Sequence, residues 1–255
     1  MRKAGQFRRG IYLLPTLFTV GNLFCGYSSL MQASLGRLDL AAMLIVLAAV
    51  LDGLDGRIAR LSGTTSVFGV QFDSLADVVS FGIAPAVLAY HWALGPGRIG
   101  WSLAFLFVAC AAMRLARFNI QSPALDKRFF VGLPAPMAGS LLAAMVIAFP
   151  ELPQEGWVSA LSAGLVCGVA LLMVSRLRYR SFREIDLRNR RSYIYVLPIA
   201  GMLVVVTLEP KFMLLASCCA YLASPALLPL LDRRQRRAAA ESAQAARAPG
   251  RGGAR

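Results

Sequence analysis

The chain has 255 residues, of which 57% are hydrophobic, and its mean hydropathy is +0.60. Soluble domains are typically about 45–50% apolar, so the composition favours a polytopic membrane protein over a soluble one. The formal net charge is +14, but the basic residues lie between apolar runs and no stacking aromatics accompany them, which argues against nucleic acid as a partner.

Eight apolar runs are candidates to cross a bilayer as helices, which takes roughly 20 residues each. In chain order they are residues 12–34, 38–56, 72–94, 99–120, 132–149, 157–175, 193–208 and 211–231, of which the seventh is the shortest. The basic segment before the first run resembles a signal peptide, but the run continues past Leu30 without a clear cleavage site, so we interpret it as a retained helix. Because backbone groups in lipid must bond internally, we expect an all-α polytopic membrane fold.

The distribution of Lys and Arg supports eight spans. With the N-terminus in the cytoplasm, 24 of the 27 basic residues lie on the cytoplasmic side, and only Arg37, Arg98 and Lys211 lie on the other. Omitting one span would place every later loop, with its basic residues, on the opposite side of the membrane. The pattern therefore predicts a protein integral to the cell (inner) membrane, with both termini cytoplasmic. Residues 1–231 are expected to form the transmembrane catalytic domain, and residues 232–255, rich in Arg, Ala and Gly, a disordered basic cytoplasmic tail.

Four of the 13 acidic residues lie at the end of the second span and the start of the third: Asp52, Asp55, Asp73 and Asp77. A carboxylate inside a membrane helix is costly and indicates a functional site by default. The first two are spaced i, i+3 and the last two i, i+4, so each pair shares one face of its helix. Since one short connection joins the two helices, we expect the four carboxylates to converge just inside the cytoplasmic face.

Clustered carboxylates repel one another unless cations neutralise them. Oxygen ligands select Mg²⁺, Mn²⁺ or Ca²⁺ over zinc, and two such ions sharing carboxylates suit phosphoryl displacement. Gly53, Gly56 and Gly69 remove side chains where a nucleotide has to approach the backbone, and Ala59 keeps its face of the helix small. Arg60 lies one helical turn from Gly56, where a guanidinium can meet a phosphate oxygen.

These residues match the signature of the CDP-alcohol phosphotransferase family, which is D-x-x-D-G-x-x-A-R, eight residues, and then G-x-x-x-D-x-x-x-D. All its fixed positions are filled, by Asp52, Asp55, Gly56, Ala59, Arg60, Gly69, Asp73 and Asp77. Further stretches resemble one branch of that family, the bacterial-type phosphatidylserine synthases: residues 17–26 (LFTVGNLFCG), 73–85 (DSLADVVSFGIAP), 114–119 (RLARFN) and 132–136 (GLPAP). The resemblance is clear over roughly residues 11–140 and thins after that.

The resemblance implies an enzyme that transfers the phosphatidyl group of CDP-diacylglycerol to L-serine, giving phosphatidylserine and CMP. It implies a core of six transmembrane helices, so that two of the eight spans here are peripheral, and a homodimer embedded among membrane lipids. It further implies that the four aspartates hold two divalent metal ions, Mg²⁺ or Mn²⁺, and that Asp77 takes the proton from the acceptor hydroxyl. The nucleotide would lie against Gly56, Ala59, Arg60 and Gly69.

Serine brings its own carboxylate, so a cationic partner is expected near the acids. Around the cytoplasmic connection between the fourth and fifth spans, the basic residues are Arg114, Arg117, Lys127 and Arg128. We prefer Arg117 together with Asn119 as the acceptor-binding pair, although the same charges also fit a purely topological role. Ser80, three residues after Asp77, is a third candidate, and helix packing would account for it equally well.

Two alternatives stay open. The same reaction could use another acceptor, glycerol 3-phosphate or inositol phosphate, whose phosphate would suit the Arg-rich stretch 176–191. An ion-coupled transporter would also place aspartates in the membrane, but near its midplane and often in inverted repeats. Here the acids lie near one interface and no repeat is visible, which disfavours the transporter.

Overall fold

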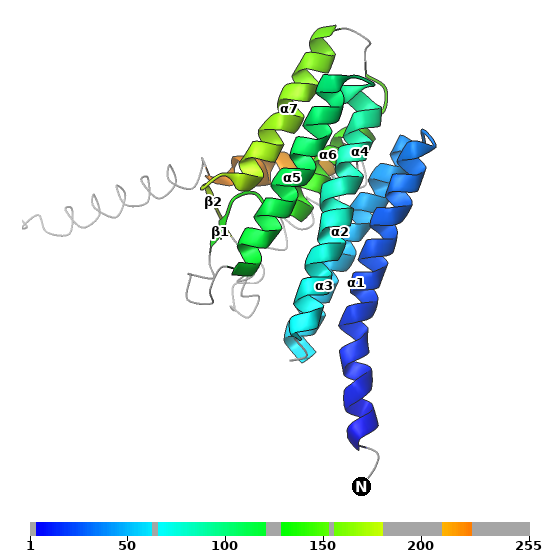
Figure 1. Ribbon diagram of the computed structural model, residues 1–255, viewed down its shortest axis with the longest axis vertical. Coiled ribbons are helices and arrows are strands. Elements are labelled where there is room, and N and C mark those ends of the chain that lie inside the picture. The colour runs from blue at the N-terminus through cyan, green and yellow to red at the C-terminus, as the bar shows by residue number, and fades with distance from the viewer. Residues whose placement is uncertain (1–3, 63–65, 121–128, 153–155, 181–210, 226–255) are drawn as a thin grey trace, which may run out of the picture.

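The computed structural model describes residues 4–62, 66–120, 129–152, 156–180 and 211–225, and this part of the chain is built almost entirely from helices (Figure 1). The helices and strands, in chain order, are α1 Ala4–Ser34, α2 Leu38–Ser62, α3 Val67–Asp77, η1 Val78–Ile83, α4 Ala84–Ala89, η2 Tyr90–Leu94, α5 Arg98–Ile120, β1 Phe129–Val131, α6 Ala135–Ala148, α7 Gly156–Val174 and β2 Arg178–Arg180. A further apolar helix, Lys211–Pro225, follows them.

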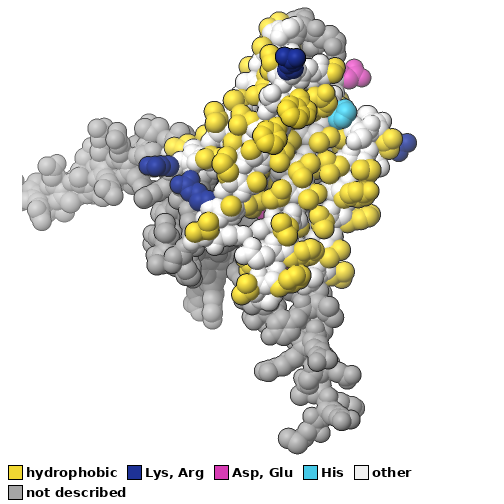
Figure 2. Space-filling model, in the orientation of Figure 1, with side chains coloured by type: hydrophobic (Ala, Val, Ile, Leu, Met, Phe, Trp, Pro, Cys, Tyr) yellow, Lys and Arg dark blue, Asp and Glu magenta, His cyan; other side chains and the backbone are white. Residues whose placement is uncertain are grey.

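Each predicted span that the structure describes coincides with a helix, so the polytopic helical fold is confirmed. Three helices are long and apolar enough to cross a membrane within the described residues: Val67–Leu94, Arg98–Ile120 and Gly156–Val174. The visible face of the molecule is mainly hydrophobic, with its few charged side chains near the margins (Figure 2). The predicted seventh span, residues 193–208, and the tail 232–255 lie outside the described residues.

Within the described residues, a short antiparallel pair of strands, β1 and β2, adds to the helices a feature that the sequence analysis did not anticipate. Phe129 pairs with Arg180 and Val131 with Arg178, so three residues from each strand are in register. The pair joins the segment before α6 to the segment after α7. The paired residues are 47 to 51 positions apart in the sequence, which is why no local pattern predicts the pair.

The helix Val67–Leu94 is continuous and alternates between α and π geometry, with three changes along its length. Segments η1 and η2 are π-helical, and η1 begins directly after Asp77. It gives way to α4 just before Pro85, whose ring lacks an N–H and clashes with the carbonyl four residues earlier in a regular helix. Since π segments inside α-helices occur frequently at functional sites, this position draws attention to the residues around Asp77.

Helix α6 lies at the centre of the bundle. It contacts α2, α4, η1 and α7, and most of its side chains are buried. A helix that is hydrophobic all round belongs in such a position, because it has no face that favours water. Helix α1 packs along α2 and also against α3, η1 and α4, so that α1 and α6 both reach η1.

Gly26 is the point where α1 comes closest to η1. A Cβ at Gly26 would lie 2.7 Å from the Cα of Ser80, which is closer than real Cβ atoms come to backbone. We therefore expect Gly26→Ala to destabilise the protein by about 1–3 kcal/mol, the usual cost of overpacking. Thermal unfolding in detergent measures this as a lower Tm.

Gly164 on α7 is the matched control, because a Cβ there would meet nothing within 4 Å. Alanine favours a helix over glycine by up to about 1 kcal/mol, so Gly164→Ala should leave the Tm unchanged or raise it. An equal fall in Tm for both variants would contradict the close packing of α1 on η1.

Candidate active site

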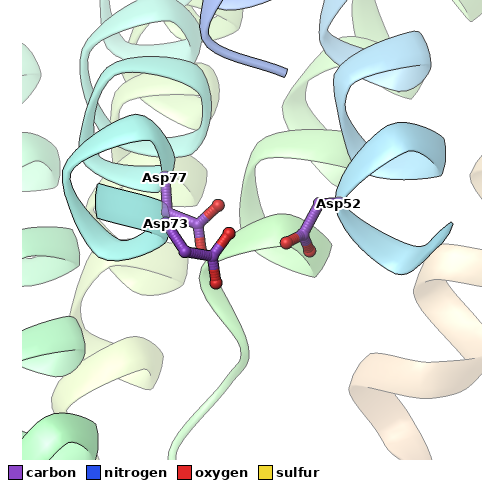
Figure 3. A group of neighbouring side chains, drawn as sticks. All are labelled: Asp52, Asp73 and Asp77. Carbon is purple, nitrogen blue, oxygen red and sulfur yellow. The ribbon is translucent and has the colours of Figure 1, made fainter. Parts of the chain in front are cut away.

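Three carboxylates from two helices meet inside the helical bundle. Asp52 comes from α2, and Asp73 and Asp77 come from α3 (Figure 3). One oxygen of each lies within 4.8 Å of an oxygen of the other two, and Asp77 is buried while the others are partly buried. In Figure 3 the two carboxylates of α3 point toward Asp52 across the space between the helices. The predicted convergence is confirmed for these three residues.

The local geometry follows directly from the helices. Residues 73 and 77 are one turn apart on α3, so their side chains lie one above the other on the same face. Helix α2 ends at Ser62 and α3 begins at Val67, and both pack against α1. Ser66 starts α3 as its N-cap and accepts a hydrogen bond from the backbone N–H of Gly69 at 2.9 Å.

The three-acid group is suited to hold a divalent cation. Oδ1 of Asp73 is buried and has no hydrogen-bond partner among the residues that the structure describes. A buried carboxylate oxygen without a partner costs free energy, and a metal ion would satisfy it. All the ligand atoms offered are carboxylate oxygens, the type that Mg²⁺ and Mn²⁺ prefer.

Asp55, the fourth predicted ligand, has a different neighbour. Its carboxylate is buried and accepts a hydrogen bond from the hydroxyl of Thr19 on α1. It is not among the three acids whose oxygens approach one another. The assignment of Asp55 as a metal ligand therefore stays a prediction, while its contact with α1 is a structural fact.

Helix α1 supplies polar partners that the sequence analysis did not assign. Nδ2 of Asn22 donates a hydrogen bond to Oδ1 of Asp77 at 3.2 Å, and Asn22 is fully buried. Ser80 donates from its hydroxyl to the backbone carbonyl of Asn22 at 3.0 Å. The available signal was the i, i+3 spacing of Thr19 and Asn22, which puts these two polar residues on one face of the first span.

The predicted nucleotide-binding residues lie on the helices that carry the acids. Gly56 is half-buried on α2, one turn from Asp52, and Gly69 lies in the first turn of α3. Ala59 and Arg60 belong to the last turns of α2, and their side chains are outside the described part of the structure. Their contact with a nucleotide stays a prediction.

The predicted acceptor-binding residues make contacts with other parts of the protein. Arg117 is exposed, and its Nη1 donates to the backbone carbonyl of Val174 at 3.3 Å, at the end of α7. Nδ2 of Asn119 donates to the hydroxyl of Ser74 at 2.9 Å. Ser80 is buried and bonded to α1. Their binding of an acceptor stays a prediction, and Lys127 and Arg128 lie outside the described residues.

Arg114 is the buried cation of this region. It lies one turn before Arg117 on α5, is 9% exposed, and places its guanidinium carbon 5.7 Å from the ring centre of Phe118. The site thus combines three carboxylates, an amide and one guanidinium, inside a helical bundle whose outer surface faces lipid.

Comparison with known proteins gives a consistent result. Residues 12–174 match the family model described as CDP-alcohol phosphatidyltransferase. The chain is 41% identical to the CDP-diacylglycerol–serine O-phosphatidyltransferase of Helicobacter pylori (strain J99), over 78% of this chain and 84% of that one. It is 34% identical to the protein of the same name from Mycobacterium leprae, over 87% and 77% of the two chains. It is 36% identical to the archaetidylserine synthase of Methanothermobacter thermautotrophicus, over 65% and 69%.

Proposed function

The chain belongs to the CDP-alcohol phosphatidyltransferase family, and from this premise we propose that it transfers the phosphatidyl group of CDP-diacylglycerol to L-serine, giving phosphatidylserine and CMP. The buried cluster of Asp52, Asp73 and Asp77 is the observation that carries the reaction class. The identity of the acceptor rests on relatives that align over most of the chain and share serine in their names.

The reaction forms one P–O bond and breaks another. The serine hydroxyl oxygen attacks the phosphorus bonded to diacylglycerol, its proton passes to the carboxylate of Asp77, and CMP leaves with the electron pair of the broken bond. Asn22 holds Oδ1 of Asp77 by its amide and so fixes the orientation of that carboxylate. The burial of Asp77 keeps competing water away from the attacked phosphorus.

Two divalent ions, Mg²⁺ or Mn²⁺, would be held by Asp52, Asp55, Asp73 and Asp77, and when bound they would supply positive charge that neutralises the diphosphate and departing CMP. The partnerless Oδ1 of Asp73 supports this assignment. Gly56 and Gly69 leave room for a nucleotide to approach the backbone, Ala59 keeps that face of α2 small, and Arg60 donates to a phosphate oxygen.

The membrane arrangement is part of the same proposal. Eight spans, a six-helix core with two peripheral helices, and cytoplasmic termini agree with the distribution of Lys and Arg. The N-terminus of α1, the C-terminus of α2 and the N-terminus of α3 lie at the same end of the molecule, which supports an active site at the cytoplasmic face (Figure 1). We extend the proposal to a homodimer, a single transmembrane catalytic domain 1–231 and a cytoplasmic tail 232–255.

The test is an acceptor comparison with the purified protein. CDP-diacylglycerol and Mn²⁺ are incubated with labelled serine, glycerol 3-phosphate or inositol phosphate in separate reactions, and CMP and labelled lipid are measured. We expect label in lipid and a matching amount of CMP with serine alone. Label in lipid from glycerol 3-phosphate or inositol phosphate, but not from serine, would refute the choice of acceptor. If no CMP is released with any of the three acceptors, the reaction class is refuted.

A further inference from the structure

A cavity lies between the first turns of α5 and α7. Its volume is about 520 Å³, within the range of about 300–1,000 Å³ that is usual for small-molecule sites. The two helices run side by side (Figure 1), and the first residue of each lines the cavity. Leu94 also lines it, and along the helix Val67–Leu94 this residue lies roughly 25 Å from Asp77. The cavity is therefore separate from the three-acid group and lies toward the other end of the bundle.

The wall of the cavity is mostly small or apolar. On α5, Ile99 and Leu103 contribute apolar side chains. On α7, the lining residues are spaced i, i+3, i+4 and i+7 and so share one face of the helix: Gly156, Ser159, Ala160 and Ala163. A Cβ added to Gly156 would meet nothing within 4 Å, so the space beside it is open. A groove of this kind between two membrane helices fits a hydrocarbon chain.

Arg98 is the one charged side chain among the described residues that line the cavity, and it is exposed at the first position of α5. Its guanidinium makes no ion pair or hydrogen bond with the part of the chain that the structure describes. The starts of the two helices add partial positive charge beside it. Since no acid among the described residues lines the cavity, its charge favours an anionic ligand over a zwitterionic one.

We propose that this cavity binds an anionic phospholipid of the leaflet that lies away from the acids, with the phosphate on Arg98 and an acyl chain along Leu103, Ala160 and Ala163. A guanidinium can donate two parallel hydrogen bonds to phosphate oxygens. Arg98 begins a helix long enough to cross the membrane, which is the level of lipid headgroups, and the groove leads from it toward the middle of the span. The bound lipid joins α5 to α7. This inference goes beyond the proposed function and does not depend on it.

The chain carries its own fluorescent reporters for this site. All three tryptophans belong to the elements that meet here: Trp92 lies on η2, Trp101 lies one turn after Arg98 on α5, and Trp157 lies in the first turn of α7. Bromine atoms on an acyl chain quench tryptophan fluorescence only at short range. They therefore report lipid bound at this end of the bundle, and not lipid attracted to basic residues at the other end.

The test uses the purified full-length protein in mixed micelles with an excess of unbrominated phosphatidylcholine. Brominated phosphatidylglycerol or brominated phosphatidylcholine with the same chains is added in separate titrations. We expect phosphatidylglycerol to reach half-maximal quenching at about a fivefold lower mole fraction, the preference that one arginine near a membrane surface provides. Arg98→Gln should abolish this preference, because it removes the cation and keeps most of the side chain.

Two controls separate charge from shape. Arg37→Gln should keep the fivefold preference, because Arg37 is an exposed arginine between α1 and α2 that does not line the cavity. Ala160→Phe fills the groove from α7 and should raise the half-maximal mole fraction of phosphatidylglycerol to that of phosphatidylcholine. Leu161→Phe is its match, since Leu161 is exposed on α7 outside the cavity, and it should leave the titrations unchanged.

Equal quenching by the two lipids in the wild-type protein overturns the inference, and so does a preference that survives Arg98→Gln. A second copy of the chain seated on the groove would also overturn it. Quenching by both lipids would then rise as dimers dissociate on dilution. None of these outcomes depends on serine transfer, which is measured separately as CMP release, so a failure of this inference is distinguishable from a failure of the proposed function.

Discussion

Asp77→Asn is expected to lower kcat for serine transfer by about 10²–10⁴-fold, the usual contribution of a positioned general base. Asparagine has nearly the same shape as aspartate, so packing against α1 is retained, but its amide cannot take the serine proton. Asn22 would still find an acceptor in the carbonyl of the new side chain, and the fold should survive with a Tm near that of the wild type.

The measurement is CMP release from CDP-diacylglycerol at saturating serine, together with thermal unfolding in detergent. Asp39→Asn is the matched control, because Asp39 is an exposed acid in the first turn of α2, far along that helix from Asp52. It should leave kcat unchanged. Wild-type turnover in a folded Asp77→Asn variant would remove Asp77 from the role of base.

Asp73→Asn is expected to weaken metal binding severely. Residues that merely support metal ligands already change affinity by about 10–100-fold, so loss of a direct ligand should raise the Mn²⁺ concentration for half-maximal activity by about 100-fold or more. The reason lies in the buried Oδ1 of Asp73, which has no hydrogen-bond partner in the described residues and lies in the three-acid group. Calorimetric titration of the purified protein with Mn²⁺ measures the affinity independently of turnover.

Asp55→Asn in the same titration decides how many of the four signature acids bind metal. If Asp55 is a ligand, its variant loses Mn²⁺ affinity to a similar degree. If the hydrogen bond with Thr19 is its main role, the affinity stays close to that of the wild type and the Tm falls instead. Unchanged Mn²⁺ affinity in the Asp73→Asn variant would refute the metal site itself.

Much of the helical framework could be predicted because it depends on properties local in the sequence. Runs of apolar residues long enough for a bilayer located the helices, and the i, i+4 spacing of Asp73 and Asp77 put both on one face. The convergence of Asp52 with them followed from the short connection between α2 and α3. The antiparallel strands could not be predicted, because their pairing joins residues that are distant in the sequence. The π segments were not anticipated either, since the apolar run that located the helix does not distinguish α from π geometry.

The partners of the acids were harder to predict for a related reason. Which polar residue of α1 faces which acid depends on the rotation of α1 against α2 and α3, and apolar runs do not specify it. The same reason explains why the sequence does not show which arginine of α5 is buried, Arg114 or Arg117. They are three residues apart, but α7 ends beside Arg117, whose side chain donates to Val174, and Arg114 is left facing inward. The sequence indicated a basic helix end without showing which residue is buried.

The polar contacts of α1 have a consequence for the biogenesis of the protein. Thr19, Asn22, Asp52, Asp73 and Asp77 all belong to α1, α2 and α3, which leave the ribosome before α5, α6 and α7. A lone carboxylate in an inserting apolar helix costs free energy, so α2 or α3 would insert less favourably alone than beside a polar partner. An α1 already in the bilayer offers hydroxyl and amide donors to the acids that follow. The first helix then acts as a built-in insertion partner, and the acidic centre can assemble before α5, α6 and α7 have been synthesised.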